Sequence, residues 1–245
     1  MRVIKYVSEV YSRLWDEMVF QNKINMQCFV YHDSADVGGL RRTLLKKKVD
    51  IEVMYVAGSF QDSDDDIKRD TGLQNVKIDR VLFSTDCSDM IFVDCEDQAL
   101  PQFRKVALGG TFDRLHNGHR KLLTVGAMVC SHTLVVGVMA DSLLKSKKLA
   151  EKIKPFETRR HLVLDFINEI KLDLPAAIVV ELNDPYGPAL SDPSVEAIVV
   201  SSETISGAHK INALRKEKDY PELRVIVIRR SDVATLSSTF LREKS

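Results

Sequence analysis

The chain has 245 residues, enough to bury a substantial core in one large domain or two small ones. Its 35 lysines and arginines balance 35 aspartates and glutamates, so its overall charge does not attract nucleic acid or an anionic membrane. No apolar run approaches the ~20 residues of a transmembrane helix, and acidic residues occur too early for a secretory or mitochondrial leader. The four cysteines are scattered without a CxxC pair, which favours reduced thiols. We therefore expect a soluble, cytoplasmic protein that binds no nucleic acid and no membrane.

The first 100 residues mix short apolar runs with one amphipathic segment. Four runs predict strands, at residues 26–32, 49–57, 77–85 and 90–95. Residues 5–20 predict an amphipathic helix, and the acidic residues 62–70 predict a solvated loop. The aspartates of that loop lack the spacing and the glycine of a calcium-binding loop. Residues 1–100 are thus predicted to form an N-terminal α/β region in which no chemistry can be identified.

The hydrophobic pattern becomes regular after Pro101, where we place a domain boundary, so that residues 101–245 form one domain. Five short, β-branched and almost continuously apolar runs follow, at residues 105–108, 133–139, 176–182, 197–201 and 224–228. Such strands are buried on both faces of a parallel sheet. Residues 119–130 and 157–171 are long enough for crossover helices. The predicted fold is α/β with a doubly wound five-stranded parallel sheet, in which ligands bind at the carboxyl ends of the strands.

The most informative segment, GGTFDRLHNGH at residues 109–119, directly follows the first of these strands. Its paired glycines let the backbone turn sharply and approach a ligand closely. The start of the following helix offers backbone amides and a partial positive charge to a phosphate. His116 and His119 are three residues apart at this helix start, so both rings can face one anion. The segment therefore predicts a phosphate cradle with two imidazoles.

Three structural alternatives apply to parts of this segment. A glycine pair before a helix is usually only a turn, and a histidine near a helix start can simply cap the helix. The two histidines could also bind zinc, but Asp113 is the only nearby residue that could add a ligand. Taken whole, the segment is far more specific than any of its parts and favours nucleotide binding.

The segment GGTFDRLHNGH resembles the signature of the HxGH nucleotidyltransferase superfamily, whose members use it to hold the phosphates of ATP or CTP. Near the other end of the domain, LSSTFLR at residues 236–242 would by itself be an ordinary helix cap. It is similar to the superfamily's ISSTxxR element, which closes over the nucleotide phosphates. The resemblance implies a Rossmann-like nucleotidyltransferase fold and an ATP site. The implied ATP-binding residues are Gly110, Thr111, Phe112, Asp113, His116, Gly118, His119, Ser237, Ser238, Thr239 and Arg242.

The sequence between these two segments is similar to phosphopantetheine adenylyltransferases of the eukaryotic type, including the adenylyltransferase half of bifunctional coenzyme A synthases. LLKSKK at residues 143–148, followed by PFETR, resembles their segment with a phosphate-binding lysine, although alone it would be a solvated basic face. DPYGP at residues 184–188 and VVSSET at residues 199–204 also look like stretches of that family. The resemblance covers residues 104–243. It implies transfer of the adenylyl group of ATP to 4'-phosphopantetheine, giving dephospho-coenzyme A and pyrophosphate.

The same resemblance implies roles for particular residues. Thr111, His119 and Lys145 are the expected catalytic residues. Thr111 and Lys145 are also expected to bind the acceptor, with Lys147 as the second choice because the lysine cluster does not align uniquely. Mg²⁺ is expected to bind through the oxygens of ATP, with no dedicated protein cage. The chain has no GxxxxGK[ST] motif, so we expect it to be monofunctional and to have a separate dephospho-coenzyme A kinase as a protein partner.

Two alternatives stay open from the sequence, because the HxGH segment specifies neither the base nor the acceptor. The chain could be another adenylyl- or cytidylyltransferase of the superfamily, although LSST is unlike the RTEGISTT-type closing element of cytidylyltransferases and favours ATP. It could also be a catalytically silent nucleotide-binding scaffold.

Overall fold

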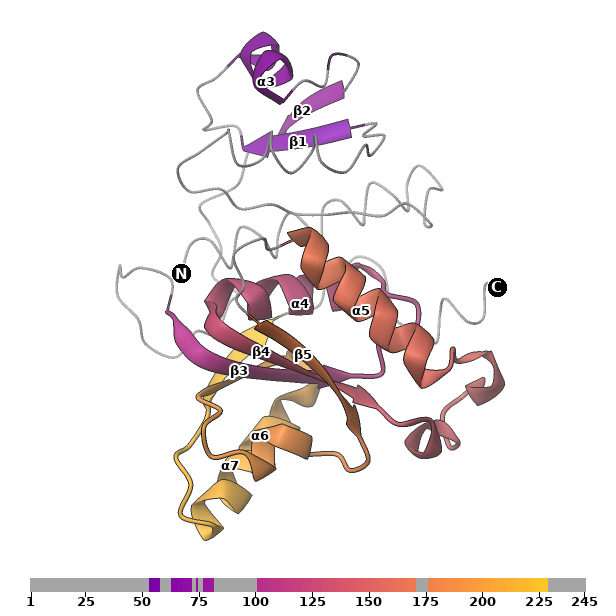
Figure 1. Ribbon diagram of the computed structural model, residues 1–245, viewed down its shortest axis with the longest axis vertical. Helices are drawn as coiled ribbons and strands as arrows, with labels where there is room; N and C mark the ends of the chain where they lie inside the picture. The colour runs from indigo at the N-terminus through magenta and orange to yellow at the C-terminus, as the bar shows by residue number, and fades with distance from the viewer. Residues whose placement is uncertain are drawn as a thin grey trace. The chain divides into compact units, whose positions relative to one another are not determined.

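A computed structural model describes residues 53–57, 63–71, 74, 77–81, 101–170 and 176–228 (Figure 1). The chain divides into two compact units, and one of them is Tyr31–Asp89. This unit contains β1 (Val53–Ala57), α3 (Asp64–Thr71) and β2 (Lys77–Val81). All later elements belong to the other unit. The predicted elements at residues 5–20, 26–32 and 90–95 lie outside the described residues, and the domain boundary near Pro101 stays a prediction.

The described part of the smaller unit is a β–α–β arrangement. β1 and β2 pair in parallel, with Val53 opposite Lys77 and Ala57 opposite Val81, and α3 connects them. The prediction of a loop at residues 62–70 was wrong, because most of that segment is the helix α3. Asp64 and Asp65 stand in its first turn and Lys68 and Arg69 in its last turn, where they stabilise a short polar helix through its dipole, although Asp70 in the last turn opposes this effect.

The larger unit contains the predicted five-stranded parallel sheet. Its strands lie in the order β5-β4-β3-β6-β7, and every neighbouring pair is parallel. The strands are β3 (Phe103–Gly110), β4 (Cys130–Met139), β5 (Ala176–Leu182), β6 (Ala197–Ser201) and β7 (Arg224–Ile228). The last three coincide with the predicted runs. The first two extend beyond them, since β3 continues into Gly109 and Gly110 and β4 begins at Cys130.

Helices cover both faces of this sheet, as a doubly wound fold requires. α4 (Asn117–Val129) and α5 (Phe156–Ile170) lie on one face, and α6 (Gly187–Ser191) and α7 (Ile205–Glu217) lie on the other (Figure 1). α4 and α5 confirm the predicted crossover helices, whereas α6 and α7 were not identified from the sequence. Three short 3₁₀ turns, η1 (Asp141–Leu144), η2 (Ala150–Lys152) and η3 (Ser202–Thr204), follow the carboxyl ends of β4 and β6.

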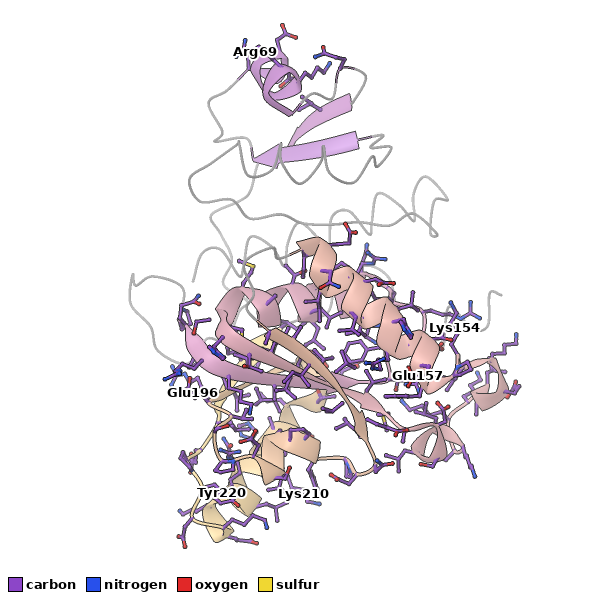
Figure 2. The ribbon with its side chains drawn as sticks, in the orientation of Figure 1. Arg69, Lys154, Glu157, Glu196, Lys210 and Tyr220 are labelled. Carbon is purple, nitrogen blue, oxygen red and sulfur yellow. The ribbon has the colours of Figure 1, made fainter. Side chains whose placement is uncertain are left out.

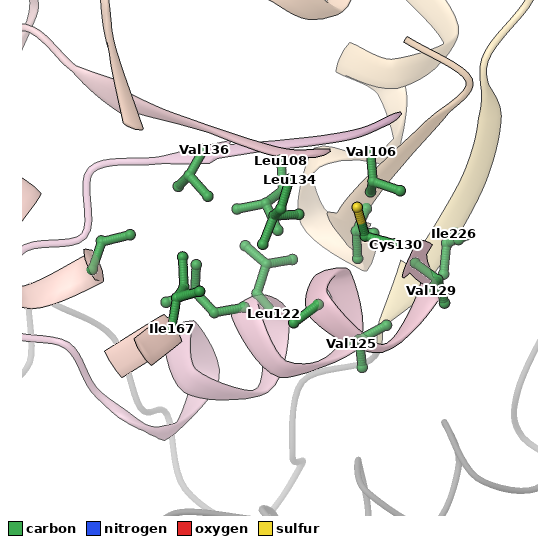
Figure 3. Packing of buried hydrophobic residues seen from close by; sticks show 14 of the residues in the cluster. Val106, Leu108, Leu122, Val125, Val129, Cys130, Leu134, Val136, Ile167 and Ile226 are labelled. Atoms are coloured by element: carbon green, nitrogen blue, oxygen red, sulfur yellow. The ribbon is translucent and has the colours of Figure 1, made fainter. Parts of the chain in front are cut away.

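The core is divided between the two faces by the alternation of side chains along the strands. In β3, Val106 and Leu108 pack with the cluster beneath α4 and α5, while Ala107 packs with the cluster on the α7 side. Figure 3 shows the first cluster, in which Leu122 of α4 points towards the sheet. Because the inner strands β4, β3 and β6 are covered on both sides, nearly continuous apolar runs were the right signal for them, whereas Ile178 of the edge strand β5 is 47% exposed. Cys130, a buried thiol, lies in the same cluster.

The connections place the two central strands at a topological switch point. β3 leads into α4 on one face, whereas its neighbour β6 leads through η3 into α7 on the opposite face. The crevice outside the carboxyl ends of two such strands is where doubly wound folds bind ligands. The segment GGTFDRLHNGH follows β3 at this position. None of the described helices is both long and apolar enough to cross a membrane.

Candidate active site

The loop between β3 and α4 has an unusual backbone. Phe112 and Arg114 have φ values of 52° and 49°, in the left-handed region that residues other than glycine seldom adopt. Each such residue costs on the order of 1 kcal/mol or more and persists only where its surroundings impose the conformation. The Phe112 side chain is fully buried and anchors the loop in the core. A strained loop held in this way at a switch point is typical of a binding site.

The two histidines of the motif stack on each other at the start of α4. Their ring centroids are 3.9 Å apart with an interplanar angle of 24°. His116 is the N-cap residue, with no side-chain capping hydrogen bond, and His119 lies inside the first turn. His119 is therefore not the N-cap residue of α4. A Cβ atom on Gly118 would lie 3.0 Å from Cε1 of His116, so the glycine leaves room for this stack.

Burial governs the charge of His119. Desolvation lowers its pKa from the ordinary 6.5 to about 4, and the positive charge of Lys147 acts in the same direction. The carboxylate of Asp113 and a hydrogen bond with the backbone of Arg114 oppose this shift. The Nδ1 atom of His119 is buried and has no hydrogen-bond partner in the described part of the chain. His119 is therefore a neutral imidazole at pH 7, in a position where a bound polyanion would raise its pKa.

This depressed pKa predicts a specific pH dependence of stability. In the unfolded chain His119 titrates near 6.5 and in the folded chain near 4, so the unfolded state binds more protons between these values. The contribution of His119 is fully present above pH 6.5 and is lost as the pH falls towards 4. From pH 7 to pH 4 the unfolding free energy of the wild type should fall by about 3 kcal/mol more than that of His119→Asn. Denaturant titrations of both proteins at several pH values measure this difference, and parallel pH profiles would contradict the assigned burial.

Lys147 reaches the loop across 36 residues of sequence. Its Nζ donates a hydrogen bond of 2.9 Å to Oγ1 of Thr111, which is only 9% exposed. Its effect on the pKa of His119 shows that Lys147 also lies within electrostatic range of the imidazole. The structure thus brings together Thr111, His119 and Lys147.

Lys145 occupies a different position. Like Lys147 it is exposed, and it lines a cavity of about 250 Å³ that also borders Asp141, Leu144, Ala150, Ile153 and Pro155. The hydrogen bond to Thr111 is made by Lys147, and the acceptor-binding roles expected of Lys145 and Lys147 stay predictions.

Asp113 connects the loop to the segment that precedes α5. Its side chain is fully buried, and Oδ1 accepts a hydrogen bond of 3.3 Å from the backbone N–H of Lys154, just before α5. This bond connects the loop to the chain segment that follows the lysine cluster. The contacts to ATP expected of Asp113, Gly110 and Phe112 stay predictions. The other expected phosphate-binding residues, Ser237, Ser238, Thr239 and Arg242, lie outside the described residues.

The zinc alternative finds no support at this loop. Among the described residues, no group of three or more histidine, cysteine, aspartate or glutamate side chains could hold a metal ion. Within this described loop, His116, His119 and Asp113 therefore do not form such a group.

Arg159 is a residue of this site that the sequence did not single out. Its side chain is 0% exposed, and one of its four hydrogen bonds goes to the carbonyl oxygen of Thr111, at 2.7 Å. An arginine near the start of a helix usually has an exposed side chain, so the sequence did not predict that Arg159 is buried. The PFETR segment in which it occurs was the only available signal.

Comparison with known proteins agrees with this geometry. The sequence model of the cytidylyltransferase-like family matches residues 107–244. A phosphopantetheine adenylyltransferase of Saccharomyces cerevisiae is 43% identical over 127 residues, which cover 52% of this chain and 41% of that protein. The matched residues therefore span less than half of the yeast relative.

Archaeal relatives are matched over most of their length. A phosphopantetheine adenylyltransferase of Methanopyrus kandleri is 43% identical over 129 residues, which cover 53% of this chain and 80% of that protein. One of Pyrobaculum aerophilum is 39% identical over 144 residues, covering 58% of this chain and 91% of that protein. The chain belongs to the cytidylyltransferase-like family of nucleotidyltransferases and, within it, to the phosphopantetheine adenylyltransferases.

Proposed function

We propose that this chain transfers the adenylyl group of ATP to 4'-phosphopantetheine, giving dephospho-coenzyme A and pyrophosphate. The observation that carries the proposal is the convergence of Lys147, Thr111 and His119 at the switch point, where a cation, a hydroxyl and an imidazole can contact two phosphate groups at once. The names of the archaeal relatives support phosphopantetheine as the acceptor. ATP is favoured over CTP by these names and by the LSST segment at residues 236–239.

The chemistry requires alignment and charge stabilisation more than proton transfer. A phosphate monoester has a second pKa near 6, so the attacking oxygen is largely ionised at neutral pH and needs no general base. The protein must bring two polyanions together and stabilise the charge that develops on the α-phosphate and the leaving pyrophosphate. Mg²⁺ carried by the oxygens of ATP would neutralise part of this charge.

Each residue of the cluster has a place in this scheme. Lys147 would neutralise the attacking phosphate, and Thr111 with the amide of Phe112 would contact the reacting groups. His119 would donate a hydrogen bond to the α-phosphate, whose charge raises the pKa of the ring when ATP binds. His116, Ser237, Ser238, Thr239 and Arg242 would hold the β- and γ-phosphates. A cytoplasmic location and a separate dephospho-coenzyme A kinase that uses the product belong to the same proposal.

Pyrophosphate release tests this function against its alternatives. The full chain is incubated with ATP or CTP, each with and without phosphopantetheine. Release that needs both ATP and phosphopantetheine is expected. Release with CTP would indicate a cytidylyltransferase, and nucleotide binding by calorimetry without release would indicate a silent scaffold.

The two candidate lysines give a selective kinetic prediction. Lys147→Ala should raise the KM for phosphopantetheine by about 10-fold to 100-fold, the value of one charge-assisted hydrogen bond, and should change the KM for ATP much less. Lys145→Ala, with the same loss of charge two residues away, should leave both values near those of the wild type. Steady-state kinetics with each substrate varied in turn measures these KM values. A raised KM for phosphopantetheine in Lys145→Ala but not in Lys147→Ala would assign the acceptor phosphate to Lys145.

A further inference from the structure

A single buried guanidinium joins the loops on both sides of the site. Arg159 lies in the first turn of α5, and its side chain is 0% exposed. Its Nη1 donates to the carbonyl oxygen of Thr111 at 2.7 Å, and its Nη2 to the carbonyl oxygen of Met139 at 2.8 Å. Nη2 also donates to Oδ1 of Asp141 at 2.6 Å, and Nε donates to the carbonyl oxygen of Lys154 at 2.8 Å.

These four acceptors belong to three separate chain segments. Thr111 follows β3, Met139 and Asp141 stand where β4 passes into η1, and Lys154 precedes α5. The second and third segments are the two ends of the connection that carries the lysine cluster. Asp141 reinforces the junction, because its Oδ2 accepts a hydrogen bond of 3.2 Å from the backbone N–H of Phe156.

The planar guanidinium of arginine is suited to holding several chain segments together. Its donors have fixed directions, so three carbonyl oxygens and a carboxylate that bind one guanidinium are held at fixed separations. Lysine would keep the charge, but it offers donors from a single nitrogen and could not reach all four acceptors. The distance between the Thr111 backbone and the base of the lysine loop is therefore set by Arg159.

We infer that Arg159 is a positioning residue for adenylyl transfer, holding Thr111 in register with Lys147. This inference rests on the proposed function. Arg159 is fully buried and acts through the carbonyl oxygen of Thr111, so it would influence the reaction without touching either substrate. Its loss would displace the hydroxyl of Thr111 from the ammonium group of Lys147 and so misalign the acceptor phosphate with the α-phosphate.

The chain supplies a matched control for a purely structural role. Arg215, in the last turn of α7, is also 0% exposed and donates only to carbonyl oxygens. Its acceptors lie just before β6 and β7 or in α6, namely Ala189, Asp192, Pro193, Val195 and Pro221. The amino ends of β6 and β7 lie at the edge of the sheet opposite the site. Figure 2 shows this separation, with Lys154 and Glu157 near the start of α5 and Glu196 and Tyr220 at the other end of the sheet.

The test compares Arg159→Lys with Arg215→Lys in the full chain. Both substitutions should lower the thermal unfolding midpoint. After correction for the folded fraction by circular dichroism, Arg159→Lys should lose about 10-fold to 100-fold in kcat/KM for phosphopantetheine, as a misplacement of about 1 Å would cause. Its ATP affinity by calorimetry should stay near that of the wild type. Arg215→Lys should retain wild-type kinetics.

A double-mutant cycle then shows whether Arg159 acts through the lysine loop. Combined with Lys147→Ala, Arg159→Lys should cost little beyond the larger single effect, because both changes break the same alignment. Asp141→Asn, a milder change at the same junction, should give a smaller loss in the same kinetic constant and serves if Arg159→Lys does not fold.

Three results would overturn the inference. The first is wild-type kinetics in folded Arg159→Lys, or in Asp141→Asn if Arg159→Lys does not fold. Effects that multiply in the cycle would show that Arg159 and Lys147 act separately. If the wild-type protein releases no pyrophosphate, the proposed function is refuted and the inference with it. The wild-type assay, run in parallel, distinguishes this outcome from a failure of the inference alone.

Discussion

His119→Asn and His119→Ala are expected to bind ATP with near-normal affinity and to lose about 100-fold to 1,000-fold in kcat, the effect of removing one preorganised donor from a transition state. The imidazole stands in the first turn of α4, stacked on His116 and 5.1 Å from the ring of Phe112, so its position is fixed before the substrate binds. A group held in this way stabilises charge that develops during the reaction more than charge already present in ATP. Calorimetry for ATP binding and steady-state kinetics for turnover separate the two effects.

The asparagine variant makes this result specific. Asparagine is a good capping residue, so a histidine that only capped the helix could be replaced with little loss. His161→Asn, at an exposed position in α5, is the control for histidine loss and should keep wild-type kcat. Near wild-type turnover in either His119 variant would return His119 to a structural role.

Arg215→Met should be the most destabilising substitution considered, costing about 3 to 5 kcal/mol of unfolding free energy if two or three of its carbonyl partners stay unsatisfied. Its guanidinium serves five carbonyl oxygens around the amino ends of β6 and β7, with distances from 2.7 to 3.3 Å. Methionine fills much of the same volume but donates no hydrogen bond, so buried carbonyl groups lose their partner at about 1 to 3 kcal/mol each where water cannot replace it. Denaturant unfolding measures the loss.

The control for Arg215 is an arginine with a surface ion pair. Arg160 contacts Glu157 one turn away in α5 at 3.3 Å, and both side chains are more than one third exposed. Arg160→Met should change stability by at most about 1 kcal/mol. If Arg215→Met also lost at most about 1 kcal/mol of unfolding free energy, the hydrogen bonds from Arg215 to carbonyl oxygens would add little to the stability of the fold.

The inner strands of the larger unit could be predicted because burial on both faces gives them nearly continuous apolar runs in the sequence. The run at residues 197–201 matches β6 residue for residue, since all but its last residue are buried. Helices gave weaker signals. α3 was taken for a loop because its sequence is polar apart from Ile67. α7 was not identified because buried positions such as Ala208 and Arg215 do not form an apolar stripe.

The loop at residues 109–119 could be proposed as a phosphate site because its glycines and histidines lie within eleven consecutive residues. Lys147 could not be separated from Lys145 in the same way, because both belong to one basic run and only the path of the η1 region brings Lys147 to Thr111. Arg159 was hidden for a related reason. Its partners are mostly backbone carbonyls from distant segments, and a sequence does not show where carbonyl oxygens converge.

Identification of the reaction product tests the central claim most directly. The full chain is incubated with ATP, Mg²⁺ and 4'-phosphopantetheine, and the products are separated by chromatography and identified by mass spectrometry. The wild type should form dephospho-coenzyme A and pyrophosphate in equal amounts, and His119→Ala should form at least about 100-fold less of both per unit time. Formation of no dephospho-coenzyme A by the folded wild-type protein, or equal formation by His119→Ala, would contradict it.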